Sequence, residues 1–113
     1  MYLFIFILFI LLGACSGSEE AFDANHPPVI EVFSCAPSYV EVSDPVHLYC
    51  RARDPDGDIV RYRFRASNSI IEYLGAGEGV AYFTKEGKWP VICEARDYTD
   101  SIDESVCIVD VER

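Results

Sequence analysis

Three aspartates lie within the segment Asp54-Pro55-Asp56-Gly57-Asp58, where their side chains could hold a cation. Proline presets φ for a turn and glycine tolerates a positive φ, so the segment is typical of a tight turn between two strands. Its carboxylates repel one another unless water or a cation lies between them, and Ca²⁺ takes about six to eight oxygen ligands of this kind. Two interpretations stay open, a solvated turn and part of a Ca²⁺ site.

The five cysteines divide into one and four. Cys15 follows an apolar run, residues 1–12, and the small residues Gly13 and Ala14. The others lie in segments of alternating polarity: Cys35, Cys50, Cys93 and Cys107. With Cys15 set apart, an even number is left, as expected for disulfides in an oxidising compartment. Four cysteines allow three pairings, and their spacing does not choose among them.

The apolar run is too short to cross a bilayer, because a helix of this length reaches roughly 18 Å and the hydrocarbon core is about 30 Å thick. It suits a signal peptide, although only the α-amino group supplies positive charge at its start. Leu12-Gly13-Ala14-Cys15 resembles the lipobox of bacterial lipoproteins, in which the signal is cut before a lipid-carrying cysteine. An ordinary secretory signal and an uncleaved anchor are the alternatives.

The lipobox resemblance implies a signal peptide over residues 1–14, lipid attachment at Cys15 and a place in the bacterial cell envelope. That place is extracytoplasmic, in the periplasm, at the outer membrane or on the cell surface. Residues 15–26 are small and acidic, which predicts a flexible tether, and Phe22 is the only large apolar side chain there. Several lipid chains hold a protein stably at a membrane, whereas one holds it only marginally.

The formal net charge is −10, and every charged residue lies after the predicted signal. This acidity argues against a nucleic-acid backbone or an anionic lipid surface as the main partner. It favours a domain that is soluble or that attracts cations. Residues 27–113 are long enough for one small domain, whose limited core makes cross-links important.

Alternating polarity predicts short strands from residue 27 onward. In one of them, Val46, Leu48 and Cys50 share a face opposite His47 and Tyr49. No segment after the signal shows a helical period. The predicted strands are residues 29–35, 46–53, 59–65, 70–74, 80–84, 89–96 and 105–112. About seven such strands predict an all-β, two-sheet antiparallel sandwich.

Short motifs in this order resemble the immunoglobulin-like and PKD-like modules of bacterial surface proteins. They are Asn25-His26-Pro27-Pro28-Val29-Ile30, Val46-His47-Leu48-Tyr49-Cys50, Asp54-Pro55-Asp56-Gly57-Asp58, Gly87-Lys88-Trp89-Pro90-Val91 and Ala95-Arg96-Asp97. The resemblance implies an immunoglobulin-like sandwich with an inter-sheet disulfide, Cys50–Cys93, and a second bridge between the first and last strands, Cys35–Cys107.

The sequence departs from both families at specific positions. Phe64 stands where immunoglobulin domains have a tryptophan, and Val91, two residues before Cys93, leaves no tyrosine corner. The Trp-Asp-Phe-Gly-Asp-Gly signature of PKD domains does not follow Tyr62.

The resemblance also places the aspartate loop at one end of the sandwich, with Asp100 nearby. The implied Ca²⁺ ligand set is Asn25, Asp54, Asp56, Asp58 and Asp97. No other cofactor is implied.

Three arginines, Arg61, Arg63 and Arg65, line the outward face of one predicted strand. They form either a patch for an anionic glycan or acidic protein, or cross-strand pairs with Glu94. Trp89 shares the inward register of Cys93, which predicts a core position.

No catalytic site is predicted from the sequence. His26 and His47 have no second histidine or cysteine at metal-ligand spacing. No nucleophile, base and acid can be assembled from neighbouring positions, and residues 75–79 read as a flexible turn rather than a phosphate-binding loop.

These features together predict a membrane-anchored lipoprotein that displays one immunoglobulin-like domain for protein or glycan interaction, in adhesion or envelope assembly. One alternative is a spacer stiffened by Ca²⁺, and another is an inhibitor or enzyme accessory subunit that presents residues 70–79. An exposed apolar patch on one sheet face would favour a protein partner, an aromatic groove a glycan, and a featureless charged surface a spacer.

Overall fold

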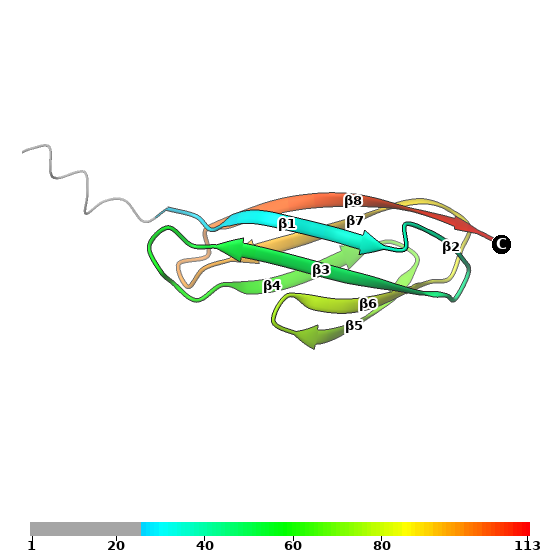
Figure 1. Cartoon of the computed structure of the whole chain (residues 1–113), viewed down its shortest axis with the longest axis horizontal. Helices are drawn as coiled ribbons and strands as arrows, with labels where there is room; N and C mark the ends of the chain where they lie inside the picture. The colour runs from blue at the N-terminus through cyan, green and yellow to red at the C-terminus, as the bar shows by residue number, and fades with distance from the viewer. Residues whose placement is uncertain (1–25) are drawn as a thin grey trace, which may run out of the picture.

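Alternating side chains produce eight strands and no helix in residues 26–113, the part of the chain that the computed structural model describes (Figure 1). This confirms the predicted all-β class. The strands are β1 (Val29–Ala36), β2 (Tyr39–Glu41), β3 (Pro45–Arg53), β4 (Arg61–Ala66), β5 (Ser69–Gly75), β6 (Glu78–Phe83), β7 (Gly87–Arg96) and β8 (Ile102–Glu112). Residues 26–113 contain no helix that is long and apolar enough to cross a membrane.

The strands form two four-stranded sheets that pack as a sandwich (Figure 1). Sheet one has the order β1-β3-β6-β5, and sheet two has the order β2-β8-β7-β4. All neighbours run antiparallel except β2, which runs parallel to β8 with Tyr39 opposite Asp110. The chain therefore passes from sheet one to sheet two between β1 and β2.

Two details differ from the strands predicted by alternation. Strand β2 was not predicted, because three residues are too few to show a period and its place depends on pairing with β8. Ile59, predicted to begin a strand, precedes β4 and is 82% exposed. It has no cross-strand partner to cover it, so its side chain stays in the solvent.

The core consists of the inward faces of the two sheets. Val46 and Leu48 from β3 meet Val91 from β7 and Val109 from β8, and all four are almost completely buried. Trp89 packs against the margin of this cluster and is only partly buried. Its indole N–H donates a hydrogen bond to the carbonyl of Lys85 (2.8 Å), which satisfies the polar end of the ring.

Two cysteine pairs lie at disulfide distance, and they are the pairs that the family resemblance implied. Cys50 on β3 and Cys93 on β7 join the two sheets across the core, with their Cα atoms 6.8 Å apart. Cys35 on β1 and Cys107 on β8 join the first strand to the last, with their Cα atoms 6.3 Å apart. Both separations lie within the usual range for bridged cysteines.

Candidate functional sites

The aspartate loop connects β3 to β4 and is a hydrogen-bonded turn. The N–H of Gly57 donates to the carbonyl of Asp54 (2.9 Å), and the N–H of Asp56 donates to Oδ1 of Asp54 (2.8 Å). Gly57 has φ of 79°, a conformation that glycine adopts without strain. The turn therefore holds the Asp54 side chain against the backbone that carries the other two aspartates.

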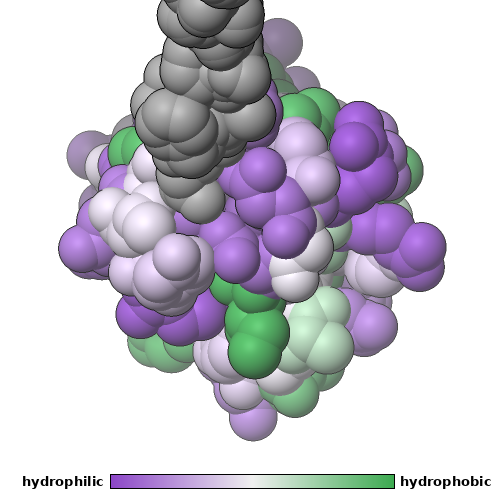
Figure 2. Space-filling view, turned by 90° about the vertical axis from the view of Figure 1, so that its left-hand side faces the viewer, coloured by the Kyte–Doolittle hydropathy of each residue, from purple (hydrophilic) through white to green (hydrophobic). Residues whose placement is uncertain are grey.

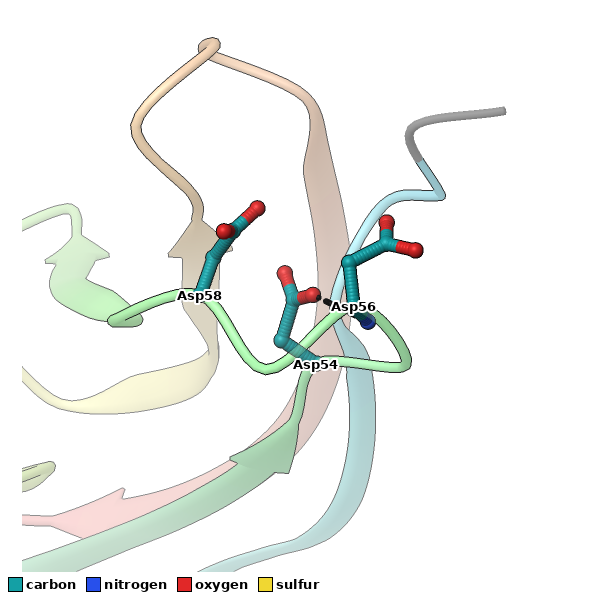
Figure 3. A group of neighbouring side chains, drawn as sticks. All are labelled: Asp54, Asp56 and Asp58. Carbon is teal, nitrogen blue, oxygen red and sulfur yellow. Dashed lines mark hydrogen bonds between the residues drawn. The ribbon is translucent and has the colours of Figure 1, made fainter. Parts of the chain in front are cut away.

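This turn brings the three predicted carboxylates together. Oxygen atoms of Asp54, Asp56 and Asp58 all lie within 4.8 Å of one another. Figure 3 shows the three carboxylates pointing to the same side of the loop. Oδ2 of Asp54 and Oδ2 of Asp58 are buried and have no hydrogen-bond partner among the described residues. Buried carboxylate oxygens without donors are unfavourable, and a hard cation would satisfy them.

The surroundings of Asp58 disfavour the charged form of its carboxyl. Burial raises the pKa of its carboxyl above 3.8, and repulsion from Asp54, Asp97 and Asp56 raises it further. Each of these causes disfavours the charged form. A bound cation would act in the opposite direction, because it stabilises every carboxylate that it touches.

Asp97 belongs to a different arrangement from the three loop aspartates. It is completely buried, and its Oδ1 accepts hydrogen bonds from the N–H of Thr99 (2.9 Å), the hydroxyl of Thr99 (2.7 Å) and the N–H of Ser101 (3.1 Å). These bonds shape the loop between β7 and β8. Asp97 is close enough to raise the pKa of Asp58, but its Oδ1 has a structural role that the sequence did not reveal.

The remaining predicted ligand and anchor lie outside the described residues. Asn25 and Cys15 both precede residue 26, so the structure does not place them. The next residue, His26, contacts the loop directly: its N–H donates to Oδ2 of Asp56 (2.6 Å), and its Nδ1 lies 3.4 Å from Oδ1. The chain therefore enters the sandwich at the aspartate end, and Figure 2 shows mostly hydrophilic side chains around this entry.

The arginine row on β4 is largely paired. Arg65 donates to Glu104 (2.7 Å), and Arg61 donates to the carbonyl of Asp97 (3.2 Å) and lies 3.5 Å from Asp100. Arg63 makes no ion pair with any residue in 26–113.

Glu94, the cross-strand partner considered for this row, forms its ion pair with Arg96 instead. Arg63 lies opposite Glu94 in the register, but the Glu94 carboxylate accepts from Arg96 (3.0 Å), two residues along its own strand. Arg96 projects from the same face and forms the ion pair with the buried Glu94 carboxylate, and Arg63 stays exposed. Exposed ion pairs of this kind contribute about 0–1 kcal/mol, so the row is not a major stabilising element.

The outward face of sheet two also carries an apolar patch. We name it the apolar quartet: Pro90 and Ile92 on β7, and Val106 and Ile108 on β8. Ile92 lies directly opposite Val106 and Pro90 opposite Ile108, so the four side chains are adjacent. Val106 is 56% exposed and Ile108 is 52% exposed. The sequence held a signal for this patch, since both β8 residues alternate with the inward-facing Cys107.

No protein-family model matches the chain, and a search of curated proteins finds no match. Among solved structures, the sandwich is similar to the PKD domain of an M14-like peptidase from Thermoplasmatales archaeon SCGC AB-540-F20. The TM-score is 0.63 at 22% identity, and the match covers 80% of this chain and all (100%) of that domain.

A second solved structure with a similar fold is a nucleoside hydrolase-related hypothetical protein from Saccharophagus degradans that is associated with carbohydrate metabolism. Here the TM-score is 0.57 at 20% identity, over 79% of this chain. The match spans only 26% of that longer protein. At these identities the likeness concerns the fold alone, and residues 26–113 have a PKD-like, immunoglobulin-like sandwich.

Proposed function

We propose that this chain is a lipid-anchored extracytoplasmic protein that presents its sandwich as a non-catalytic module for binding another protein. The apolar quartet is the observation that carries the proposal. Outward sheet faces of a small sandwich are expected to be polar, and a contiguous exposed apolar patch marks an interaction site.

The extracytoplasmic location is supported by the cysteines. Two pairs at disulfide distance in one small domain fit an oxidising compartment. The lipobox resemblance at Leu12-Gly13-Ala14-Cys15 supplies the anchor. Because His26 lies at the aspartate end, against Asp56, a tether that joins the domain there would leave the outward face of sheet two accessible from the side.

Metabolic labelling with palmitate tests the anchor. We expect the full-length protein to carry label and to sediment with membranes, and Cys15→Ser to lose both properties. Ser18→Ala, in the same acidic segment, is the matched control and should behave like the wild type. Label that persists in Cys15→Ser would contradict lipid attachment at this residue.

Photo-crosslinking in intact cells tests the interaction function. A benzoylphenylalanine placed at Val106 should form an adduct with another protein chain when the full-length protein is irradiated. The same probe at Val32, which is 45% exposed on the other sheet, is the control and should form little adduct. Absence of any adduct from position 106 would overturn the interaction function.

A second candidate function is a spacer whose membrane-proximal end is stiffened by Ca²⁺. The observation that favours it is the pair of buried, unpartnered oxygens on Asp54 and Asp58. A cation bound there would also restrain Asp56, whose carboxylate accepts a hydrogen bond from the backbone N–H of His26. Millimolar Ca²⁺ should raise the melting temperature of the full-length protein more than Mg²⁺ does, because Mg²⁺ demands tighter octahedral geometry.

A further inference from the structure

We propose that the protein bound by the outward face of sheet two is a second copy of this chain. The two copies pack face to face about a two-fold axis that passes through the apolar quartet. This inference rests on the proposed interaction function and names its partner.

Charged side chains lie at two opposite corners of the face, on either side of the quartet. Arg61 and Arg63 occupy one corner of the face, on the edge strand β4. Glu41 and Glu112 lie opposite each other at the diagonal corner, on the edge strand β2 and the end of β8. All four side chains are exposed. We name these the basic corner and the acidic corner after their exposed arginines and glutamates; Glu94 and Glu104 share the row of Arg63, and the apolar quartet lies between the corners.

The quartet lies between these two corners. Arg63 shares a row with Glu94 and Glu104, and β8 continues from Glu104 past Val106 and Ile108 to Glu112. The eight residue steps from Glu104 to Glu112 span roughly 26 Å at about 3.3 Å per residue. The quartet occupies two of the three rows between Arg63 and Glu112, the third being Lys88 and Asp110, and it lies on the two central strands of the sheet. It is thus close to the midpoint of the diagonal.

This arrangement of charges suits a two-fold symmetric pair of copies. In a two-fold interface, if residue i contacts residue j, then j also contacts i. Consider a two-fold axis that lies between the two faces and runs perpendicular to the diagonal at its midpoint. This axis places the quartet of one copy on the quartet of the other. It also places each basic corner over the acidic corner of the other copy. The same geometry therefore buries both apolar quartets and pairs Arg63 of each copy with Glu112 of the other.

Two copies of this acidic chain can associate only if opposite charges meet locally at their interface. Each chain carries a formal charge of −10, so two copies repel each other at long range. A face that combines apolar contact with two symmetric sets of opposite charges offsets that repulsion. Arg63, which makes no ion pair within its own described chain, is available for the contact.

The size of the face sets the expected strength. The face is three strand spacings wide, roughly 15 Å, and roughly 26 Å long between the corners along β8. This is smaller than a standard interface of about 800 Å² per partner. We therefore expect a dimer that dissociates in dilute solution and forms at the membrane, where anchoring raises the effective concentration.

The experiment uses the full-length protein in its membrane, with two epitope tags on co-expressed copies. The photo-crosslinker at Val106 should give an adduct of twice the chain mass that contains both tags, and the probe at Val32 should not. An adduct of another mass would overturn the second-copy inference and leave the protein-interaction function standing. No adduct from position 106 would overturn both.

Charge exchange tests the two-fold geometry. Arg63→Glu and Glu112→Arg should each lower the yield of the double-mass adduct at least about fivefold. The combined variant should restore it, because in a two-fold dimer the exchanged charges face each other again. Arg51→Glu, on the outward face of sheet one, is the control and should leave the yield unchanged. Failure of the combined variant to restore the adduct, with melting temperatures unchanged, would overturn the proposed axis.

Discussion

Asp58 carries a pH-dependent contribution to stability that a single substitution isolates. Its pKa in the folded state lies above 3.8, because of burial and then repulsion from Asp54, Asp97 and Asp56. The folded state thus holds this proton more tightly than the unfolded state does. The contribution to stability is fully present below the ordinary aspartate pKa and is lost as the pH rises through the raised value.

We therefore expect Asp58→Asn to raise the melting temperature at pH 7 in Ca²⁺-free buffer and to change it little below pH ~4. Melting curves across this pH range, recorded in EGTA, provide the measurement. Glu72→Gln, which removes an exposed carboxylate on β5, is the matched control for the loss of one negative charge. A lower melting temperature for Asp58→Asn at pH 7 would contradict the raised pKa.

In Ca²⁺, Asp58→Asn should lower the melting temperature relative to the wild type rather than raise it. A ligand that binds only the folded state stabilises it by RT ln(1 + [L]/Kd), which is about 1.4 kcal/mol at a tenfold excess over Kd. The wild type should gain this stabilisation in Ca²⁺, and Asp58→Asn should gain less, because an amide is a weaker ligand than a carboxylate. Equal Ca²⁺ responses in the two proteins would exclude Asp58 from the site.

At the scale of elements, the turn between β5 and β6 is tightly packed against β3. The expectation of a merely flexible turn over residues 75–79 is incomplete, because Gly77 is buried and its carbonyl accepts the N–H of Cys50 (2.8 Å). A Cβ on Gly77 would overlap the carbonyl of Cys50. Gly77 also has φ of 81°, where other residues are strained.

Gly77→Ala should consequently lower the free energy of unfolding by roughly 2–4 kcal/mol, from left-handed strain and overpacking together. Gly57→Ala is the matched comparison, since it has a similar φ of 79° but nothing within 4 Å of its added Cβ. It should cost only about 1–2 kcal/mol. Denaturant midpoints measure both, and equal losses would show that the contact with β3 is unimportant.

Alternation along each strand predicted most elements, because one face of every strand meets the core and the other meets solvent. The structure differs from the prediction where strand pairing or side-chain pairing, rather than the alternation of polarity, decides a residue's place. Strand β2 has only three residues and exists because β8 offers an edge. Glu94 faces outward on a mostly polar face yet is buried, because Arg96 covers it.

At the scale of the whole molecule, the two cysteine pairs have different structural roles. Cys50 and Cys93 are at most 1% exposed, whereas Cys35 and Cys107 are only partly buried. The sequence separations are 43 and 72 residues, for which the chain-entropy model gives about 4 kcal/mol each. Replacing the buried pair also leaves a cavity in the core.

We therefore expect Cys50→Ala with Cys93→Ala to destabilise the protein more than Cys35→Ala with Cys107→Ala, although the second pair closes the longer loop. Unfolding curves of the two double variants give the comparison. Non-reducing peptide mapping of the wild type checks the pairing, and a Cys35–Cys50 peptide would contradict it. A larger loss for Cys35 and Cys107 would show that loop length outweighs burial.

The sequence by itself determined the all-β class, most strand positions and the group of three aspartates, because these depend on residues that are close together along the chain. The tertiary structure decided which distant residues meet. It buried Asp97 as a loop-shaping acceptor, brought His26 to Asp56 and gave Glu94 to Arg96. It also joined residues of β7 and β8 into the apolar quartet and set charges of β4 and β2 at opposite corners. Such groupings depend on sheet order and register, which local alternation of polarity does not encode.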